Sequence, residues 1–373
     1  MTTTINNKNK KPNVPNLRFP EFQREWEKCK LGDLCNVLMC KHILASQTNT
    51  EEGVPFYKIG TIGNAPDAYI SKELFDDYKT KFNYPHKGEV MITCAGTVGK
   101  CVIYDGKDAY YQDSNIVWID NPSQCISNSF LYHLLAKVDW RKLNSTTIIR
   151  IYNDDLRNLK LSYPQIEEQQ KISRLLSFLD ERIATQNKII DKLQSLIKGI
   201  AHKISKQGKP NTRLTECLQC SSSTLQESEV AEVGVYPVYG ANGIVGFLDY
   251  YNTANEAIYI IKDGSGVGTV SYVNGKCSVT GTLNTLQAKD GFSLRYLYFM
   301  LKVFSFEPYK TGMAIPHIYF KDYGKAKIYC PSYELQNKYA DLLSKIELKA
   351  IAEQKILDNL YGQKQYLLRQ VFI

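Results

Sequence analysis

The chain has 373 residues and a net charge of +8, and 43% of its residues are hydrophobic. This length allows two or three folded domains, and the apolar content excludes a chain that stays disordered. No run approaches the roughly 18 apolar residues that a membrane helix needs, and the N-terminal residues hold no apolar signal core. The sequence therefore predicts a cytoplasmic protein with no membrane contact, whose ten cysteines are reduced thiols.

Residues 1–19 form a basic arm in which several cations precede the first acid, Glu21. Such an arm is typical of a solvated tail, or of a segment that lies on a phosphate backbone. A first domain is predicted over residues 20–164, where Val, Ile, Tyr, Gly, Asn and Thr give a mixed texture of strands and turns.

A glycine turn, TCAGTVGKC at residues 93–101, follows a short apolar run in this first domain. It matches a phosphate-binding loop only in part. Cys94 stands where the first glycine belongs, and Cys101 replaces the hydroxyl residue that would bind Mg²⁺. The pattern argues against an ATP site. Similar text, IKDGSGVGTV, recurs at 261–270, so the turn is one copy of a repeat.

The remaining elements follow in chain order and complete the repeat. Residues 165–204 have apolar positions at spacings of three and four and predict a long amphipathic helix. A polar linker at 205–213 leads to a second domain at 214–331, and a second long helix is predicted at 332–373. Ile151 matches Ile318 and Pro164 matches Pro331, both at an offset of 167 residues.

The repeat is looser upstream, where the glycine turns match at an offset of 169 and KLGDLC at 30 matches RLTECL at 213. The first half therefore carries extra residues in its loops. A helix of about 40 residues spans about 60 Å, which is longer than one such domain. We expect the two stripes to bury each other as a parallel or antiparallel coiled coil, although each helix could instead fold back on its own domain.

The predicted fold class is α+β. Two mixed domains with cores rich in strands and turns are separated by two long helices, and the whole has a pseudo-twofold internal repeat.

Catalytic groupings are scarce in the sequence. A Mg²⁺-dependent nuclease could be assembled from Asp67, Asp77 and Lys79, but these lie in a general charge run without a counterpart in the second half. The pair Cys217 and Cys220 has metal-ligand spacing, but no second pair is near it in the sequence. A solvated charged face and reduced thiols explain these residues more simply. No metal site and no catalytic residue is predicted.

The whole layout resembles the specificity (S) subunit of type I restriction-modification systems, the HsdS family. The resemblance covers nearly all of the chain. It is carried by the entry PNLRFPEFQREWEKCKLGDLC, by GEVMITCAGTVGKCVIYDG, and by a proline followed by a Gln-rich helix start, PQIEEQQKI and the more divergent PSYELQNKY. The terminal YGQKQYLLRQVFI also fits.

The resemblance implies a non-catalytic subunit with two target recognition domains, each of which reads one half of a split DNA sequence. It implies that the helices set the spacing and dock two methyltransferase (M) subunits, and that restriction (R) subunits join this core. SAM, ATP and Mg²⁺ would belong to those partners, and this chain would hold no cofactor. The moderately basic net charge suits double-stranded DNA as the anionic partner.

A glycine turn can bring backbone N–H groups and small side chains close to phosphates or base edges, and amide side chains suit adenine. The candidate DNA-binding residues therefore lie in the turns and in the neighbouring polar loops. In the first half they are Thr93, Thr97, Lys100, Gln112, Ser114, Asn115, Thr146 and Arg150. In the second half they are Lys262, Ser265, Thr269, Thr282, Asn284, Lys310, Thr311 and His317.

The chain end is unusually apolar. Leu368, Val371 and Phe372 lie where fraying is normally expected, which predicts a surface for the methyltransferase subunits, with burial against the first helix as the alternative. Two other functions remain open at this point: the stand-alone nuclease, and a scaffold whose coiled coil is its whole function.

Overall fold

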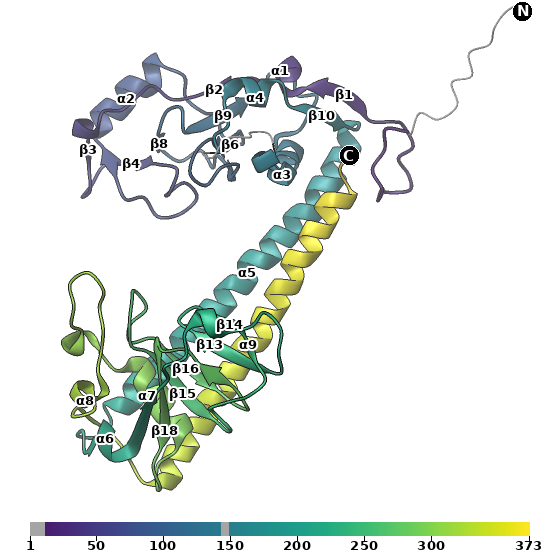
Figure 1. Cartoon of the computed structure of the whole chain (residues 1–373). Coiled ribbons are helices and arrows are strands. Elements are labelled where there is room, and N and C mark those ends of the chain that lie inside the picture. Colours follow the sequence, from purple (N-terminus) through teal and green to yellow (C-terminus); the bar gives the residue numbers. More distant parts are fainter. Residues whose placement is uncertain (1–11, 143–148) are drawn as a thin grey trace, which may run out of the picture. The chain divides into compact units, whose positions relative to one another are not determined.

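The computed structural model describes residues 12–142 and 149–373, and the candidate Thr146 lies outside these ranges. The chain forms two compact units. Unit 1 consists of Met1–Ala184 together with Asp358–Ile373, and unit 2 consists of Thr185–Leu357. Figure 1 shows that each unit combines a mixed globular part with portions of the two long helices, α5 (Ile166–Ser205) and α9 (Tyr333–Gln370).

The centre of unit 1 is an antiparallel sheet of four strands in the order β2-β9-β6-β7. The strands are β2 (Asn36–Leu38), β9 (Ile116–Asp120), β6 (Val90–Thr93) and β7 (Cys101–Ile103). Every residue of β6 is buried. Val90 and Ile92 belong to the core shared with helix α3 (Asn128–Lys137), whereas Met91 belongs to a second core. This alternation follows from the two-residue period of a strand and explains the continuous apolar run.

The second core of unit 1 lies under a smaller sheet with the order β3-β5-β4-β8. Its strands are β3 (Thr48–Asn49), β5 (Tyr69–Ile70), β4 (Val54–Tyr57) and β8 (Tyr110–Tyr111). Helix α2 (Lys72–Lys81) follows β5 and begins at Ser71, whose hydroxyl accepts the Leu74 N–H at 3.2 Å. Phe75 of α2 is completely buried in this core.

Two strands join the beginning and the end of the globular part of unit 1. They are β1 (Glu27–Lys30) and β10 (Lys160–Tyr163), which pair antiparallel. The short helices α1 (Leu31–Leu34) and α4 (Asn153–Arg157) lie beside them.

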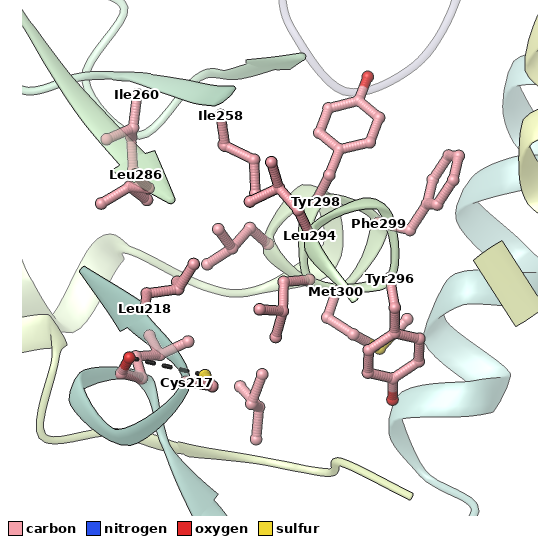
Figure 2. Packing of buried hydrophobic residues seen from close by; sticks show 14 of the residues in the cluster. Cys217, Leu218, Ile258, Ile260, Leu286, Leu294, Tyr296, Tyr298, Phe299 and Met300 are labelled. Carbon is pink, nitrogen blue, oxygen red and sulfur yellow. Dashed lines mark hydrogen bonds between the residues drawn. The ribbon is translucent and has the colours of Figure 1, made fainter. Parts of the chain in front are cut away.

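Unit 2 repeats the central sheet with the strand order β12-β18-β15-β16, again antiparallel. These strands are β12 (Leu218–Ser222), β18 (Leu283–Ala288), β15 (Ala257–Ile261) and β16 (Val270–Val273). Helix α7 (Leu294–Val303) takes the place of α3 and contributes the large side chains of the core in Figure 2, among them Tyr296, Phe299 and Met300. The internal repeat is therefore a repeat of topology.

Further strands and short helices surround the central sheet of unit 2. A second sheet has the order β14-β13-β17, and β11 pairs with β19 as β1 pairs with β10 in unit 1. Their bounds are β11 (Thr212–Arg213), α6 (Leu214–Cys217), β13 (Tyr236–Gly240), β14 (Gly243–Leu248), β17 (Ser278–Val279), α8 (Phe320–Tyr323) and β19 (Lys327–Ile328). The extra loop residues of the first half lie between β2 and β6, where unit 1 has helix α2, whereas unit 2 has only a 3-10 turn, Glu227–Glu229, between β12 and β15.

A buried glutamine fixes the start of each long helix. The Gln169 side chain accepts the Ser127 N–H at 2.8 Å and donates to the carbonyls of Cys125 and Pro164, each at 2.8 Å. Gln336, 167 residues later, accepts the Ser293 N–H and donates to the Pro331 carbonyl, both at 2.9 Å. Because Ser127 and Ser293 are the N-caps of α3 and α7, each glutamine ties a long helix to the helix on the central sheet.

The acid beside the first glutamine is also buried. Glu168 receives two hydrogen bonds of 2.8 Å from the Arg18 guanidinium and one of 3.3 Å from the Trp26 indole. Arg18 therefore holds the N-terminal segment against α5. This contact occupies the one cation of the predicted basic arm that falls within the described residues.

Parts of α5 and α9 pack against each other inside each unit. In unit 2 the Gln186 amide donates to the Glu353 backbone carbonyl at 3.0 Å and also contacts the Glu353 carboxylate, and the Tyr339 hydroxyl donates to the Gln207 side chain just after α5. In unit 1 Lys364 forms an ion pair with Asp180. Residue numbers rise along one helix as they fall along the other, so the contacting segments of unit 2 run antiparallel. Their buried apolar positions include Ile190, Ile197, Ile204, Ala350 and Leu357.

The C-terminal residues after α9 enter the core of unit 1. Val371 is 3% exposed and Phe372 is 4% exposed. The Phe372 ring lies 5.0 Å from that of Phe130 and 6.5 Å from that of Trp26, and Leu368 packs on the same core. The prediction of a partner surface is therefore corrected for Val371 and Phe372, which the core around α3, Trp26 and α5 covers, in line with the alternative of burial within the chain. Leu368 is only partly buried.

Within residues 12–142 and 149–373, the structure contains no helix with the length and apolar character required to cross a membrane.

Truncation of the Phe372 ring should destabilise unit 1. Phe372→Ala is expected to lower its free energy of unfolding by about 3–5 kcal/mol, the usual cost of an aromatic cavity in a core. Urea unfolding of the full chain, combined with hydrogen exchange of the α3 amides, measures this loss. Tyr366→Ala is the matched control, since Tyr366 is 60% exposed on α9, and should change stability by less than about 0.5 kcal/mol. Equal effects of both changes would contradict a core role for the tail.

Candidate nucleic-acid interface

In unit 1, three segments that are distant in sequence meet at one edge of the central sheet, where strand β6 ends and strand β9 begins. The Cys94 N–H donates to the Asn115 carbonyl at 2.7 Å, and the Ile151 N–H donates to the Cys94 carbonyl at 2.8 Å. The Arg150 guanidinium donates to the Ser114 carbonyl at 3.4 Å. The structure thus brings together the glycine turn, the loop before β9 and the segment before α4, which carry most candidates of the first half.

Unit 2 assembles the same kind of edge. The Lys262 N–H donates to the Thr282 carbonyl at 3.0 Å, and the Ile318 N–H donates to the Lys262 carbonyl at 2.9 Å. Thr311 and His317 exchange backbone hydrogen bonds of 2.9 and 2.8 Å. His317 also lies 3.7 Å from the Asp263 carboxylate. We refer to each of these two edges as a turn edge: residues 94–100, 112–115 and 149–151 in unit 1, and residues 262–269, 280–284 and 310–318 in unit 2.

The candidate side chains differ in how far a ligand can reach them. The exposed ones are Thr97, Ser114, Ser265, Thr269 and Thr311. The partly buried ones are Lys100, Gln112, Asn115, Arg150, Lys262, Thr282, Lys310 and His317. Of the partly buried cations, Lys100 donates to the Ile62 carbonyl at 2.5 Å, and Lys310 pairs with Glu307 at 2.5 Å.

Two candidates are buried and have structural roles. Thr93 is inaccessible, and its hydroxyl accepts the Lys100 N–H at 3.0 Å and donates to the Thr97 carbonyl. Asn284 is 4% exposed and accepts the Ser222 hydroxyl at 2.7 Å. Both side chains hold the turn edges in shape, and neither presents a free surface to DNA.

Both glycine turns rest on an aromatic ring. Gly99 has a φ of +82°, and a Cβ atom at this position would lie 2.1 Å from Cδ1 of Trp140. Gly268 has a φ of +89°, and its Cβ would lie 3.1 Å from the Phe306 side chain. Both the backbone conformation and the close approach therefore require glycine. The turn is packed from below and presents its outer face to solvent.

The thiols that interrupt the phosphate-loop pattern are not reactive groups. Burial raises the pKa values of Cys94 and Cys101 to about 12 each. Both remain neutral thiols at physiological pH, so neither serves as a nucleophile or as a charged metal ligand. Besides Lys100, the turn offers a ligand backbone and hydroxyl groups.

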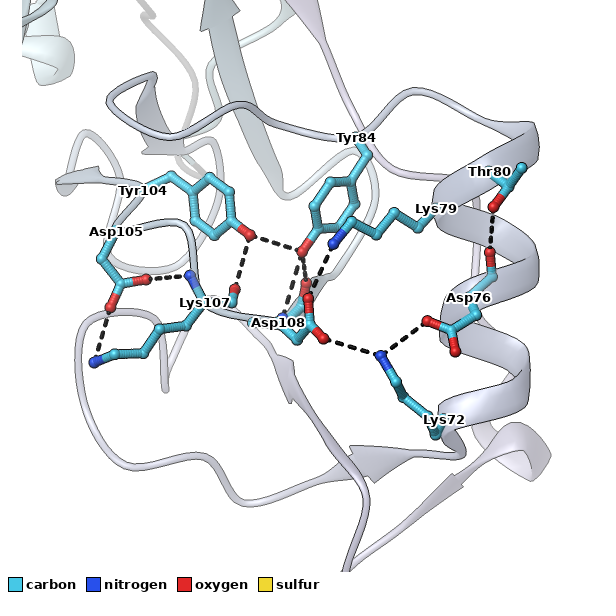
Figure 3. Close-up of polar contacts among 10 residues, drawn as sticks. Lys72, Asp76, Lys79, Thr80, Tyr84, Tyr104, Asp105, Lys107 and Asp108 are labelled. Atoms are coloured by element: carbon cyan, nitrogen blue, oxygen red, sulfur yellow. Dashed lines mark hydrogen bonds and ion pairs between the residues drawn. The ribbon is translucent and has the colours of Figure 1, made fainter.

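The three residues of the hypothetical nuclease site do not converge. Asp67 pairs with Lys58 at 3.1 Å, and Asp77 pairs with Lys81 at 2.5 Å. Lys79 instead reaches Asp108 at 2.9 Å, as Figure 3 shows. Within the described part of the chain, no three His, Cys, Asp or Glu side chains are grouped so that they could hold a metal ion.

The sequence comparisons give the family of this fold. The chain matches the family described as type I restriction modification DNA specificity domain twice, over residues 23–195 and 213–360. The chain belongs to this family.

Individual relatives agree with this assignment. A putative type I restriction enzyme specificity subunit of Haemophilus influenzae is 47% identical over 169 residues, which cover 45% of this chain and 43% of that protein. The putative MjaX specificity subunit of Methanocaldococcus jannaschii is 24% identical over 212 residues, covering 53% of this chain and 50% of that protein. The chain thus spans about half the length of these curated relatives. The solved S subunit of a type I system from M. genitalium has a similar fold, with a TM-score of 0.65 at 21% identity over 96% of this chain and 99% of that one.

Replacement of Gly99 by alanine tests whether packing on the Trp140 ring constrains the glycine turn. Gly99→Ala combines a left-handed backbone cost of about 1–2 kcal/mol with overpacking against Trp140 of about 1–3 kcal/mol. Gly88→Ala is the control, because Gly88 has a φ of +94° with nothing within 4 Å of its Cβ position. Urea unfolding should show the larger loss for Gly99→Ala. Similar losses for the two variants would mean that contact with the ring does not constrain the turn.

Proposed function

We propose that this chain is the DNA sequence-recognition subunit of a type I restriction-modification complex. The observation that carries the proposal is the repeated turn edge: both units present a ring-supported glycine turn beside polar loops on the same sheet topology. The membership in the specificity-domain family supports it. Each unit would read one half of a bipartite sequence in double-stranded DNA.

The side chains on the two edges are different, as two unlike half-sites require. Unit 1 offers Gln112 and Asn115, whose amides suit bidentate contacts to adenine, whereas unit 2 offers the hydroxyl of Thr282 and the ring of His317. The common frame positions the loops, and the loop residues supply the selectivity.

The chemistry of the complex would reside in partners. We propose that two methyltransferase subunits bind SAM, and that restriction subunits supply the functions that depend on ATP and Mg²⁺, all in the cytoplasm. With the C-terminal residues buried, exposed apolar side chains of the long helices are the better docking candidates. These are Phe178 and Leu196 on α5, with Leu348, Ile351 and Tyr366 on α9.

A domain exchange tests whether each unit reads its own half of a bipartite DNA sequence. Residues 20–160 would be replaced by those of another family member, together with residues 366–373, because Phe372 packs into this unit. The methylated adenines of host cells should then show a change in one half of the recognised sequence only. A change in both halves would contradict independent reading. Absence of salt-sensitive DNA binding by the unmodified protein would favour the scaffold function.

Paired insertions in the helices test whether they set the spacing between the half-sites. Seven residues would be added after Asp191 in α5 and after Leu348 in α9, two exposed positions. Two helical turns lengthen each helix by about 10 Å, so the unread gap should grow by about three base pairs at 3.4 Å each. Both half-sites should stay the same. A constant gap would assign the spacing to the partner subunits or to bending of the DNA.

A further inference from the structure

We propose that unit 1 holds a second DNA contact, a basic groove beside its turn edge that binds the phosphate backbone. The inference rests on the proposed function and extends it to residues with no role so far. The groove has a volume of about 630 Å³. The residues that carry the proposal are Lys41, Lys81, Phe82, Asn83, Asn153 and Arg157.

Three elements form its walls. The segment after β2 contributes Lys41, the end of α2 contributes Lys81 to Asn83, and α4 contributes Asn153 and Arg157. Lys41, Lys81 and Arg157 are all exposed, and the Lys41 ammonium lies 5.5 Å from the centre of the Phe82 ring. Three cations and two amide side chains make a lining that suits phosphate oxygens.

The groove opens at the same end of the sheet as the glycine turn. Leu38 pairs with Trp118, and Trp118 pairs with Met91, so the chain leaves β2 at the end where β6 enters the turn. His42 then contacts the Asp113 carboxylate at 2.8 Å, next to the candidate residues 114 and 115. A DNA duplex bound at the turn edge of unit 1 could therefore contact this groove of the same unit as well.

Salt bridges within the helices do not neutralise the groove permanently. Lys81 pairs with Asp77 at 2.5 Å, and Arg157 pairs with Asp154 at 3.0 Å. Both are exposed pairs of neighbouring turns, which contribute only about 0.3–0.5 kcal/mol each. A phosphate can replace these carboxylates at small cost, and the displaced acids remain in water.

The α2 wall is fixed before any ligand arrives. Figure 3 shows Asp108 between Lys72 and Lys79, with both contacts at 2.9 Å. Just after α2, the Tyr84 hydroxyl donates to the Ala109 carbonyl at 2.7 Å. Since these contacts hold α2 against the loop before β8, little ordering is needed on binding.

Unit 2 does not repeat the elements and side chains that line this groove. Between β12 and β15 it has a single 3-10 turn, Glu227–Glu229, in place of an α-helix such as α2, and the positions 167 residues after Asn153 and Arg157 are Phe320 and Gly324. A Cβ on Gly32 would lie 3.0 Å from the Arg157 carbonyl, and a Cβ on Gly324 would lie 2.7 Å from Thr215. In the aligned segments KLGDLC and RLTECL, Gly32 matches Thr215. Unit 1 thus packs a glycine against Arg157, whereas unit 2 packs Thr215 against a glycine. The contact to DNA backbone through this groove belongs to unit 1 alone.

The test measures the salt dependence of DNA binding by the full chain together with its methyltransferase subunits. The duplex carries the sequence found methylated in the host. The triple variant Lys41→Ala, Lys81→Ala, Arg157→Ala should reduce the magnitude of the slope of log K against log salt by about two to three, because each lost phosphate contact removes about 0.9. Single variants should each remove about 0.9. With the triple variant, ethylation interference should lose signals only at phosphates of the half-site that unit 1 reads.

The control removes three other cations of unit 1, Lys28→Ala, Lys107→Ala and Lys160→Ala, which are exposed and lie outside the groove. Equal slopes for the two triple variants would overturn the inference. Loss of methyltransferase assembly with an unchanged slope would also overturn it, since the groove would then be a protein contact. If the unmodified complex itself shows no salt-dependent binding, the proposed function fails as well, which separates the two failures.

Discussion

The arrangement of each unit depends on a buried glutamine at the start of a long helix. Gln169 and Gln336 lie inside the protein, 0% and 1% exposed, and each joins the proline that precedes its helix to the first residues of α3 or α7. A buried backbone group without a partner costs about 1–3 kcal/mol, so a shorter or apolar side chain would leave several such groups unpaired. The glutamines thereby fix the angle at which each helix leaves its sheet, and with it the face that the apolar stripe presents.

The residues at the end of α9 pack into unit 1, which is otherwise formed by the first half of the chain. Asp358–Ile373 belong to unit 1, where Phe372 completes the cluster around Trp26 and Phe130. The Leu17 N–H donates to the Gln370 carbonyl at 2.9 Å, and Lys137 donates to the terminal residue at 2.9 Å. Unit 1 therefore folds completely only when residues 358–373 are present, a non-local requirement that slows folding relative to local contacts.

Periodicity and repetition predicted the long helices, the doubled α+β organisation and the glycine turns, because these depend on local spacing and on the comparison of two halves. The burial of Val371 and Phe372 was predicted only as the alternative to a partner surface, since an apolar chain end looks the same whether a partner or another part of the chain covers it. Thr93 and Asn284 were offered as contacts because polarity in a loop does not reveal burial. The proposed basic groove left a trace in the sequence, however: Asn153 and Arg157 stand where the second half has Phe320 and Gly324, and a search for differences between the halves would have marked them.

Such differences follow from what the repeat must conserve. The central sheet, the ring beneath the glycine turn and the glutamine at the helix start each satisfy a packing or hydrogen-bond requirement that permits few alternatives. The segment between β2 and β6 packs chiefly on a separate second core, so it can gain a helix without disturbing the core shared with α3. In the proposed recognition subunit, the same frame can therefore carry two unlike reading surfaces, and the surface with the added helix gains backbone contacts that the other lacks. Recognition by two related domains then need not be symmetric in affinity, even where the fold is.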